Sequence, residues 1–202
     1  MLVFQELHNY LPEPSLPIIE KWFADYSFNL KITKKRQTKL GDFRVKHRSV
    51  KHQITVNGNL NPYSFLITLT HEFAHLLVWE NYKKRLQPHG SEWKNQFSAL
   101  LMELIINQVF PEDIKNVLIE HAKNPAASSV RDVALTVVLN KYNPEKEIIY
   151  LSEIPLGAHF SIHNKRVFAK GEKRRTRYLC KEIASNKQYL VHGSAEVVLV
   201  DN

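Results

Sequence analysis

The first 143 residues combine helical and strand-like patterns of apolar residues. Apolar residues recur every three to four positions in five segments, which predicts helices over residues 15–26, 62–82, 92–109, 112–121 and 130–139. Between the first two helices the period shortens, and this predicts about three strands over residues 28–33, 42–47 and 53–58. Elements in this order are typical of an α+β unit, and we expect its strands to form a small antiparallel sheet.

The pattern changes after Asn143 and Pro144. Five strand-like runs follow, separated by glycine, asparagine and charged turns, over residues 147–162, 166–171, 174–183, 187–193 and 195–200. We therefore predict two domains, an α+β domain over residues 1–143 and a small all-β module over residues 144–202.

Composition is consistent with a globular chain. It has 202 residues, 44% of them hydrophobic, which suffices for one or two domains with buried cores. The chain has a single cysteine, Cys180, so a disulfide within the chain is excluded and a reducing compartment is favoured. We expect Cys180 to be a buried core residue on a strand. There is no basic segment followed by an apolar run at the N-terminus, and no apolar stretch of ~18 residues. We therefore expect a soluble, cytoplasmic protein with no membrane contact.

Residues 70–93, THEFAHLLVWENYKKRLQPHGSEW, place a glutamate and histidines in an otherwise apolar stretch. Asn61 and Pro62 are a typical N-cap and first residue for the helix that carries them. Because His71 and His75 are four residues apart, a helix puts both imidazoles on one face. With Glu72 they form an HExxH motif, in which the histidines bind Zn²⁺ and the glutamate is the general base. The competing interpretation is two histidines on a helix flank, each bonded to a carbonyl.

A catalytic zinc needs a third protein ligand. The residues alone leave three candidates, which are Glu92, Glu103 and His89. His89 precedes Gly90, and a glycine lets the backbone turn sharply there. Trp93 is expected to anchor the helix that follows.

HEFAH, a short basic connection and HGSEW together resemble the SprT-like (Spartan-type) metallopeptidases. Their shared pattern is HExxH, a histidine–glycine pair downstream and an aromatic residue on the next helix. KLGDFRV resembles the glycine-plus-aromatic strand before the site in that family, and QITVNGNLNP resembles the strand and turn that lead into the metal helix. The resemblance covers roughly residues 14 to 110. It implies a zincin-like unit with one catalytic zinc on His71, His75 and His89, and Glu72 as general base.

The C-terminal module departs from the family. Many SprT-like proteins end in a zinc ribbon built from paired cysteines, whereas this module has only Cys180. A four-cysteine zinc site is therefore impossible here. We expect a β fold without metal or an unrelated module.

Basic residues cluster in two places. Residues 31–51 hold nine basic side chains and one acidic one, and this excess of +8 equals the net charge of the whole chain. Such residues can track a phosphate backbone while aromatic neighbours stack on unpaired bases, but they are also common on the solvated face of a sheet. The candidate nucleic-acid contacts are Lys34, Lys35, Arg36, Lys39, Arg44, Lys46, Arg48, Lys173, Arg174, Arg175 and Arg177.

Motif, resemblance and charge together predict a zinc metalloendopeptidase. The resemblance implies that it acts on DNA-associated proteins, such as DNA–protein crosslinks, with DNA as a sequence-nonspecific partner. Two alternatives stay open. One is a nucleic-acid-binding protein whose zinc site is structural or vestigial, and the other is a general peptidase without DNA dependence.

Overall fold

A computed structural model describes residues 4–36, 38–45, 51–84, 86–126, 132–143, 149–162 and 166–200. The chain divides into two compact units, Met1–Ala127 and Ser128–Asn202. This division lies before the expected boundary at residues 143 and 144, so the last helix of the chain falls in the second unit. Lys46 and Arg48, two of the candidate nucleic-acid contacts, lie outside the described residues.

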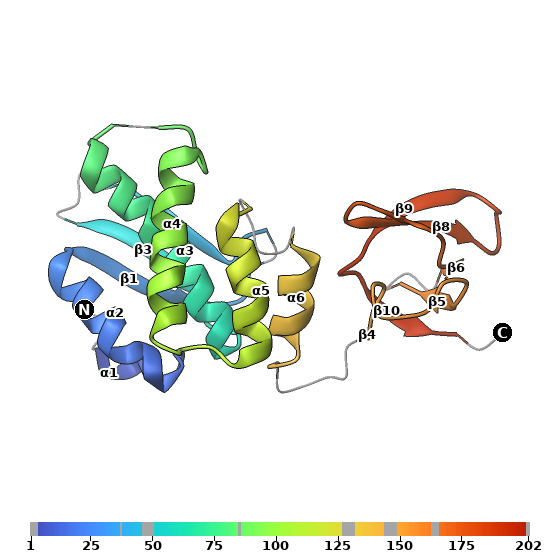
Figure 1. The fold of residues 1–202 in the computed structure, drawn as a ribbon, viewed down its shortest axis with the longest axis horizontal. Helices are drawn as coiled ribbons and strands as arrows, with labels where there is room; N and C mark the ends of the chain where they lie inside the picture. The colour runs from blue at the N-terminus through green and yellow to red at the C-terminus, as the bar shows by residue number, and fades with distance from the viewer. Residues whose placement is uncertain are drawn as a thin grey trace. The chain divides into compact units, whose positions relative to one another are not determined.

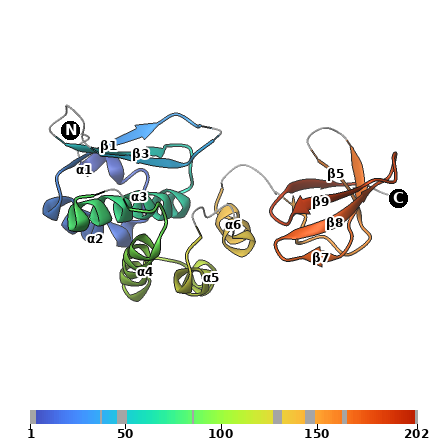
Figure 2. The same ribbon diagram turned by 90° about the horizontal axis from the view of Figure 1, so that it is seen from above.

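Unit 1 stacks helices on one face of a small sheet (Figure 1; Figure 2). Seen from above, α2 and α3 lie beneath the sheet, and α4 and α5 lie beneath them (Figure 2). Its elements are α1 (Phe4–Leu7), a 3₁₀ turn (Glu13–Ser15), α2 (Leu16–Asp25), β1 (Phe28–Thr33), β2 (Gly41–Arg44), β3 (His52–Asn57), α3 (Pro62–Tyr82), α4 (Ser91–Ile106) and α5 (Glu112–Lys123).

The sheet is mixed, and the expectation of an antiparallel sheet was wrong. Its order is β1-β3-β2, with β3 antiparallel to β2 but parallel to β1. After β1 the chain passes to the outer strand β2 and returns as β3 between the two, so β3 runs in the direction of β1. The central strand is buried along most of its length, with Ile54 and Val56 fully inaccessible. Alternation within each strand cannot reveal this order, because it depends on which strand occupies the centre.

The long helix α3 begins and ends where the sequence predicts. The Asn61 side chain accepts a hydrogen bond from the Ser64 N–H at 2.9 Å, and Pro62 occupies the first turn. Phe65, Leu69 and Phe73 are almost completely buried. Because α3 packs on β2 and β3 on one side and on α4 on the other, it is the central element of unit 1.

In its described residues, unit 2 is rich in β structure and contains one helix. Its strands join in the order β4-β10-β5-β6-β8-β7, with β9 also pairing with β8. Phe160, Phe168 and Cys180 are buried in its core, which confirms the expected place of the cysteine. The elements are α6 (Val133–Asn140), β4 (Ile149–Tyr150), β5 (His159–Ser161), β6 (Val167–Ala169), β7 (Lys173–Arg174), β8 (Arg177–Glu182), β9 (Gln188–His192) and β10 (Glu196–Leu199).

Among the described residues, no helix combines the length and the apolar character that crossing a bilayer requires.

The Asn61 cap generates a stability prediction. Asn61→Ala removes the acceptor for the Ser64 N–H and should lower the free energy of unfolding by about 1 kcal/mol. Asn61→Ser keeps a capping oxygen and is the matched control. Urea unfolding followed by circular dichroism measures both variants, and equal stability of Asn61→Ala and wild type would show that the cap contributes nothing.

Candidate metal centre

Three imidazoles from two parts of unit 1 converge. His71 and His75 lie on α3, and His89 lies in the connection just before α4. The Nε2 atom of His89 is 3.0 Å from Nε2 of His71 and 3.2 Å from Nε2 of His75. Among the described residues, these three histidines are the cluster of metal-binding residue types whose donor atoms lie within 4.8 Å of one another.

The donor set fits zinc. Zn²⁺ binds imidazole nitrogens at about 2.0–2.1 Å, so two nitrogens on adjacent corners of a tetrahedron lie about 3.3 Å apart. The observed separations of 3.0 and 3.2 Å are close to that value. Burial and the neighbouring imidazoles lower the pKa of His71 to about 2 and that of His75 to about 4. Both rings are therefore neutral at pH 7, which is the form that binds a metal.

Backbone conformation at His89 brings its ring to the cluster. His89 has a φ of 58°, in the left-handed region, whereas Gly90 has an ordinary φ of −69°. The sharp turn expected at Gly90 therefore occurs one residue earlier. Residues other than glycine adopt this conformation at a cost of about 1–3 kcal/mol, and such strain concentrates at functional sites.

Trp93 packs against all three histidines. Its side chain is 1% exposed, and its ring centroid lies 4.5, 5.4 and 4.6 Å from those of His71, His75 and His89. The indole N–H also donates to the backbone carbonyl of His71 at 3.3 Å. Trp93 therefore anchors the start of α4, as the sequence predicts, and in addition fixes the positions of the imidazoles.

Glu72 follows His71 on α3, and its carboxylate lies against Gly41 of β2. It is 7% exposed and accepts a hydrogen bond from the backbone N–H of Phe43. Burial raises the pKa of Glu72 to about 8, and the negative charge of Asp42 adds to this, while the Phe43 N–H and the cations Arg36 and Lys39 oppose it. A metal cation at the histidines would favour the ionised carboxylate, because opposite charges at short range stabilise the charged form.

The other two candidates for third ligand lie apart from the histidine cluster. The Glu92 carboxylate accepts a hydrogen bond from the hydroxyl of Ser91 at 3.1 Å. The Glu103 carboxylate accepts one from the indole N–H of Trp22 at 3.2 Å and pairs with Lys21 at 3.8 Å. The geometry therefore favours His89.

The basic residues of unit 1 do not form one surface. Arg36 turns inward, donating to the side chains of Asn57 and Thr55 at 2.7 and 3.0 Å and to the carbonyl of Leu40 at 3.3 Å. Lys39 and Arg44 both pair with Asp42, at 2.9 and 2.7 Å. Only two of the described candidates in this unit remain exposed without a described ion pair, and these are Lys34 and Lys35.

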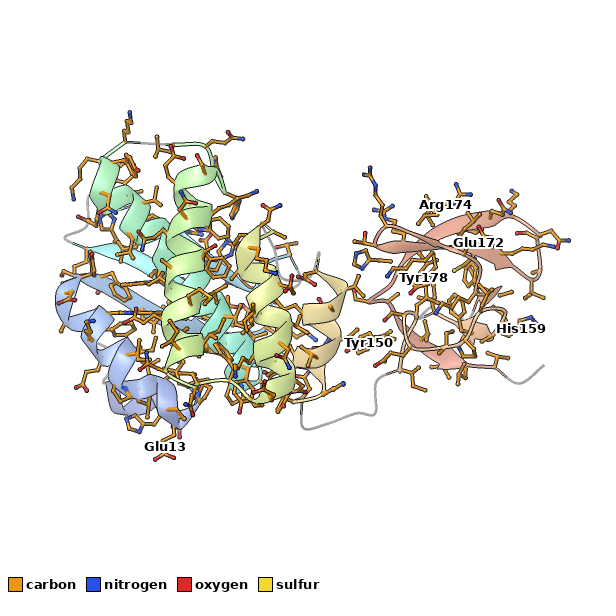
Figure 3. The ribbon with its side chains drawn as sticks, viewed as in Figure 1. Glu13, Tyr150, His159, Glu172, Arg174 and Tyr178 are labelled. Carbon is orange, nitrogen blue, oxygen red and sulfur yellow. The ribbon has the colours of Figure 1, made fainter. Side chains whose placement is uncertain are left out.

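Lys173, Arg174, Arg175 and Arg177 come together at one hairpin of unit 2, where β7 pairs with β8. All four are exposed, and within the described part of the chain none of them forms an ion pair. Arg174 lies at the rim of the unit, and the ring of Tyr178 lies further inside (Figure 3).

The hairpin continues into a basic sheet face. Along β8 the side chains alternate, with Tyr178 and Cys180 buried and Arg177 and Lys181 exposed. Residues paired across antiparallel strands share a face. The outer face of β7, β8 and β9, which we call the basic face, therefore carries Arg174, Arg177, Leu179, Lys181, Gln188, Leu190 and His192. The exposed Glu172 borders this face, because its backbone carbonyl accepts a hydrogen bond from the Leu179 N–H at 2.9 Å and it lies two residues before Arg174.

The sequence did not indicate which residues lie around Glu72. Gly41 and Phe43 were noted through the resemblance of their strand to a family pattern, and Arg36 was predicted to contact nucleic acid. The available signal was a glycine immediately before an alternating strand, which often marks a close approach of the backbone.

Comparison with known proteins gives one match. The family model described as the SprT-like family matches residues 17–115. No curated protein and no solved structure matches this chain.

The cluster generates a prediction about metal content. His89→Ala removes one of three converging donors, so the purified variant should lose zinc that the wild type retains during dialysis against a weak chelator. Mass spectrometry of the metal measures this, with His192→Ala in unit 2 as the matched control. Equal zinc in His89→Ala and wild type would exclude His89 as a ligand.

Proposed function

Residues 17–115 belong to the SprT-like family, which is associated with metallopeptidase activity, and from this premise we propose that the chain is a zinc-dependent endopeptidase. The observation that carries the proposal is the convergence of three imidazoles, with a buried glutamate directly after the first of them on the same helix. His71, His75 and His89 hold the metal.

Bound zinc supplies Lewis acidity, which acidifies a water molecule and polarises a peptide carbonyl. Glu72 handles the protons. Its carboxylate takes a proton from the attacking water and then delivers that proton to the nitrogen of the leaving amine. Burial raises the pKa of Glu72 to about 8, and a bound cation would lower it again, toward the neutral range in which one group can accept and then release a proton.

We further propose that the substrates are DNA-associated proteins, including proteins crosslinked to DNA. The basic face of unit 2 supports this, since it presents Arg174, Arg177 and Lys181, and none of the three forms an ion pair within the described residues. Basic side chains on an open sheet face contact phosphates irrespective of sequence. DNA would then bring the peptidase to proteins already bound there.

Two other functions are each favoured by one observation. The basic face by itself favours a nucleic-acid-binding protein whose zinc site is structural or vestigial. Conversely, Arg36, Lys39 and Arg44 are engaged within unit 1, which favours a general peptidase without DNA dependence.

The catalytic role of Glu72 generates the first test. Glu72→Gln keeps the size of the side chain but cannot accept a proton, so proteolysis should fall by about 10²–10⁴-fold. Zinc content should stay at the wild-type value. Cleavage of a DNA-binding protein measures the first and metal analysis the second. Full cleavage by Glu72→Gln, or none by the zinc-loaded wild type, would contradict the peptidase proposal.

The basic face generates a second test. Each phosphate contact to a single strand adds about 0.7 to the magnitude of the slope of log affinity against log salt. Replacing Arg174 and Arg177 together by alanine should therefore lower that magnitude by about 1.4, measured with single-stranded DNA by fluorescence anisotropy. Lys115→Ala, which removes a paired cation on α5, is the control.

Peptidase assays with and without the same DNA distinguish the alternatives. Casein cleavage that ignores DNA, together with no retention on DNA at low salt, would select the general peptidase. DNA binding without any zinc-dependent cleavage would select the nucleic-acid-binding protein.

A further inference from the structure

Strand β2 passes directly over the carboxylate of Glu72. A Cβ atom placed on Gly41 would lie 2.6 Å from Oε1 of Glu72, 2.7 Å from its Cγ and 2.8 Å from Cγ2 of Thr68. Real Cβ atoms essentially never approach so closely. The φ of Gly41 is not in the left-handed region, so the glycine is required for space and not for conformation.

Neither neighbour can move aside easily. The Thr68 hydroxyl donates to the carbonyl of Ser64 at 2.7 Å, which fixes the orientation of its methyl group. The Cγ of Glu72 is next to the helix backbone, so its displacement would carry the whole carboxylate with it. Any side chain at position 41 therefore moves the glutamate or the strand.

The amide of Phe43 points toward Glu72 because of the ladder register. In an antiparallel pair, alternate residues turn their N–H and C=O groups away from the partner strand. The Asn57 N–H donates to the Leu40 carbonyl at 2.9 Å, so residue 40 faces β3, and so do residues 42 and 44. The N–H of Phe43 consequently faces away from β3, and it is this group that donates to the Glu72 carboxylate.

The start of β2 is held in place by a buried polar network. Asn57 is 1% exposed, and its amide donates to the carbonyl of Lys39 at 3.0 Å. Arg36 donates to Asn57, Thr55 and the Leu40 carbonyl, so one guanidinium links β3 to the residue before Gly41. The planar fork of arginine suits this role, and a lysine cannot reproduce it.

We propose that Gly41, the Phe43 amide and Arg36 are positioning residues that fix the Glu72 carboxylate beside the metal-binding histidines. This inference rests on the proposed peptidase function. It assigns Arg36 a role in the reaction and not in nucleic-acid binding.

Gly41→Ala is the decisive variant. Misplacement of a catalytic group by about 1 Å costs on the order of 10²-fold in rate. We expect kcat to fall by that order while KM and zinc content stay at wild-type values. Asn61→Ala lowers stability without touching Glu72 and is the control, with kcat expected within about twofold of wild type at a temperature where it remains folded.

Arg36→Lys keeps the positive charge but removes the planar guanidinium that donates to Asn57, Thr55 and Leu40. It is the second variant, for use if Gly41→Ala does not fold. Its kcat should fall by about tenfold, less than the loss expected for Gly41→Ala, and its zinc content should stay at the wild-type value. Unchanged kcat in either folded variant would overturn the inference, and so would loss of zinc in step with activity.

The apoprotein gives a readout that needs no activity. In ¹H–¹⁵N spectra, Glu72→Ala should move the Phe43 amide proton upfield more than any other amide of β2, because it removes a charged acceptor. A Phe43 amide that does not respond would contradict the hydrogen bond on which the inference rests. If the wild type cleaves protein and Glu72→Gln does not, the peptidase proposal holds, and the Gly41→Ala, Arg36→Lys and NMR results then test the positioning role alone. If the wild type and Glu72→Gln cleave equally, the proposed peptidase function itself is contradicted.

Discussion

The packing of α4 against α3 is the constraint on which the rest of the site depends. Two histidines one helical turn apart form only part of a metal site, and the third stands outside any regular element. Trp93 closes this gap, since its buried indole contacts all three imidazoles and bonds to the backbone of His71. The free energy gained by burying the Trp93 indole thus helps to hold the three imidazoles in place.

Strand β2 packs on α3 next to the histidines. Gly41 of β2 covers the Glu72 carboxylate, and the Phe43 ring stacks on that of His75 with their centroids 6.5 Å apart. This arrangement explains the local excess of positive charge better than a surface role alone does. Arg36, Lys39 and Arg44 make ion pairs and hydrogen bonds within the sheet, and Arg36 and Lys39 partly offset the cost of burying Glu72.

Local features were predictable from sequence, and the arrangement of elements was not. The Asn61 cap, the limits of α3 and the buried face of α4 follow from short-range rules of capping and periodicity. The parallel pairing of β1 with β3 depends on which strand occupies the centre of the sheet, and no local pattern encodes that. The inward turn of Arg36 depends on Asn57, twenty-one residues away, and no local sequence pattern indicates the left-handed conformation of His89.

The central claim is that His71, His75 and His89 bind one zinc ion and leave a position for solvent. X-ray absorption spectroscopy of the zinc-loaded wild-type protein tests it most directly. The account predicts three imidazole nitrogens and one oxygen at about 2.0–2.1 Å, the shell of an open catalytic site. A shell with two imidazoles, or one closed by a fourth protein ligand, would contradict it.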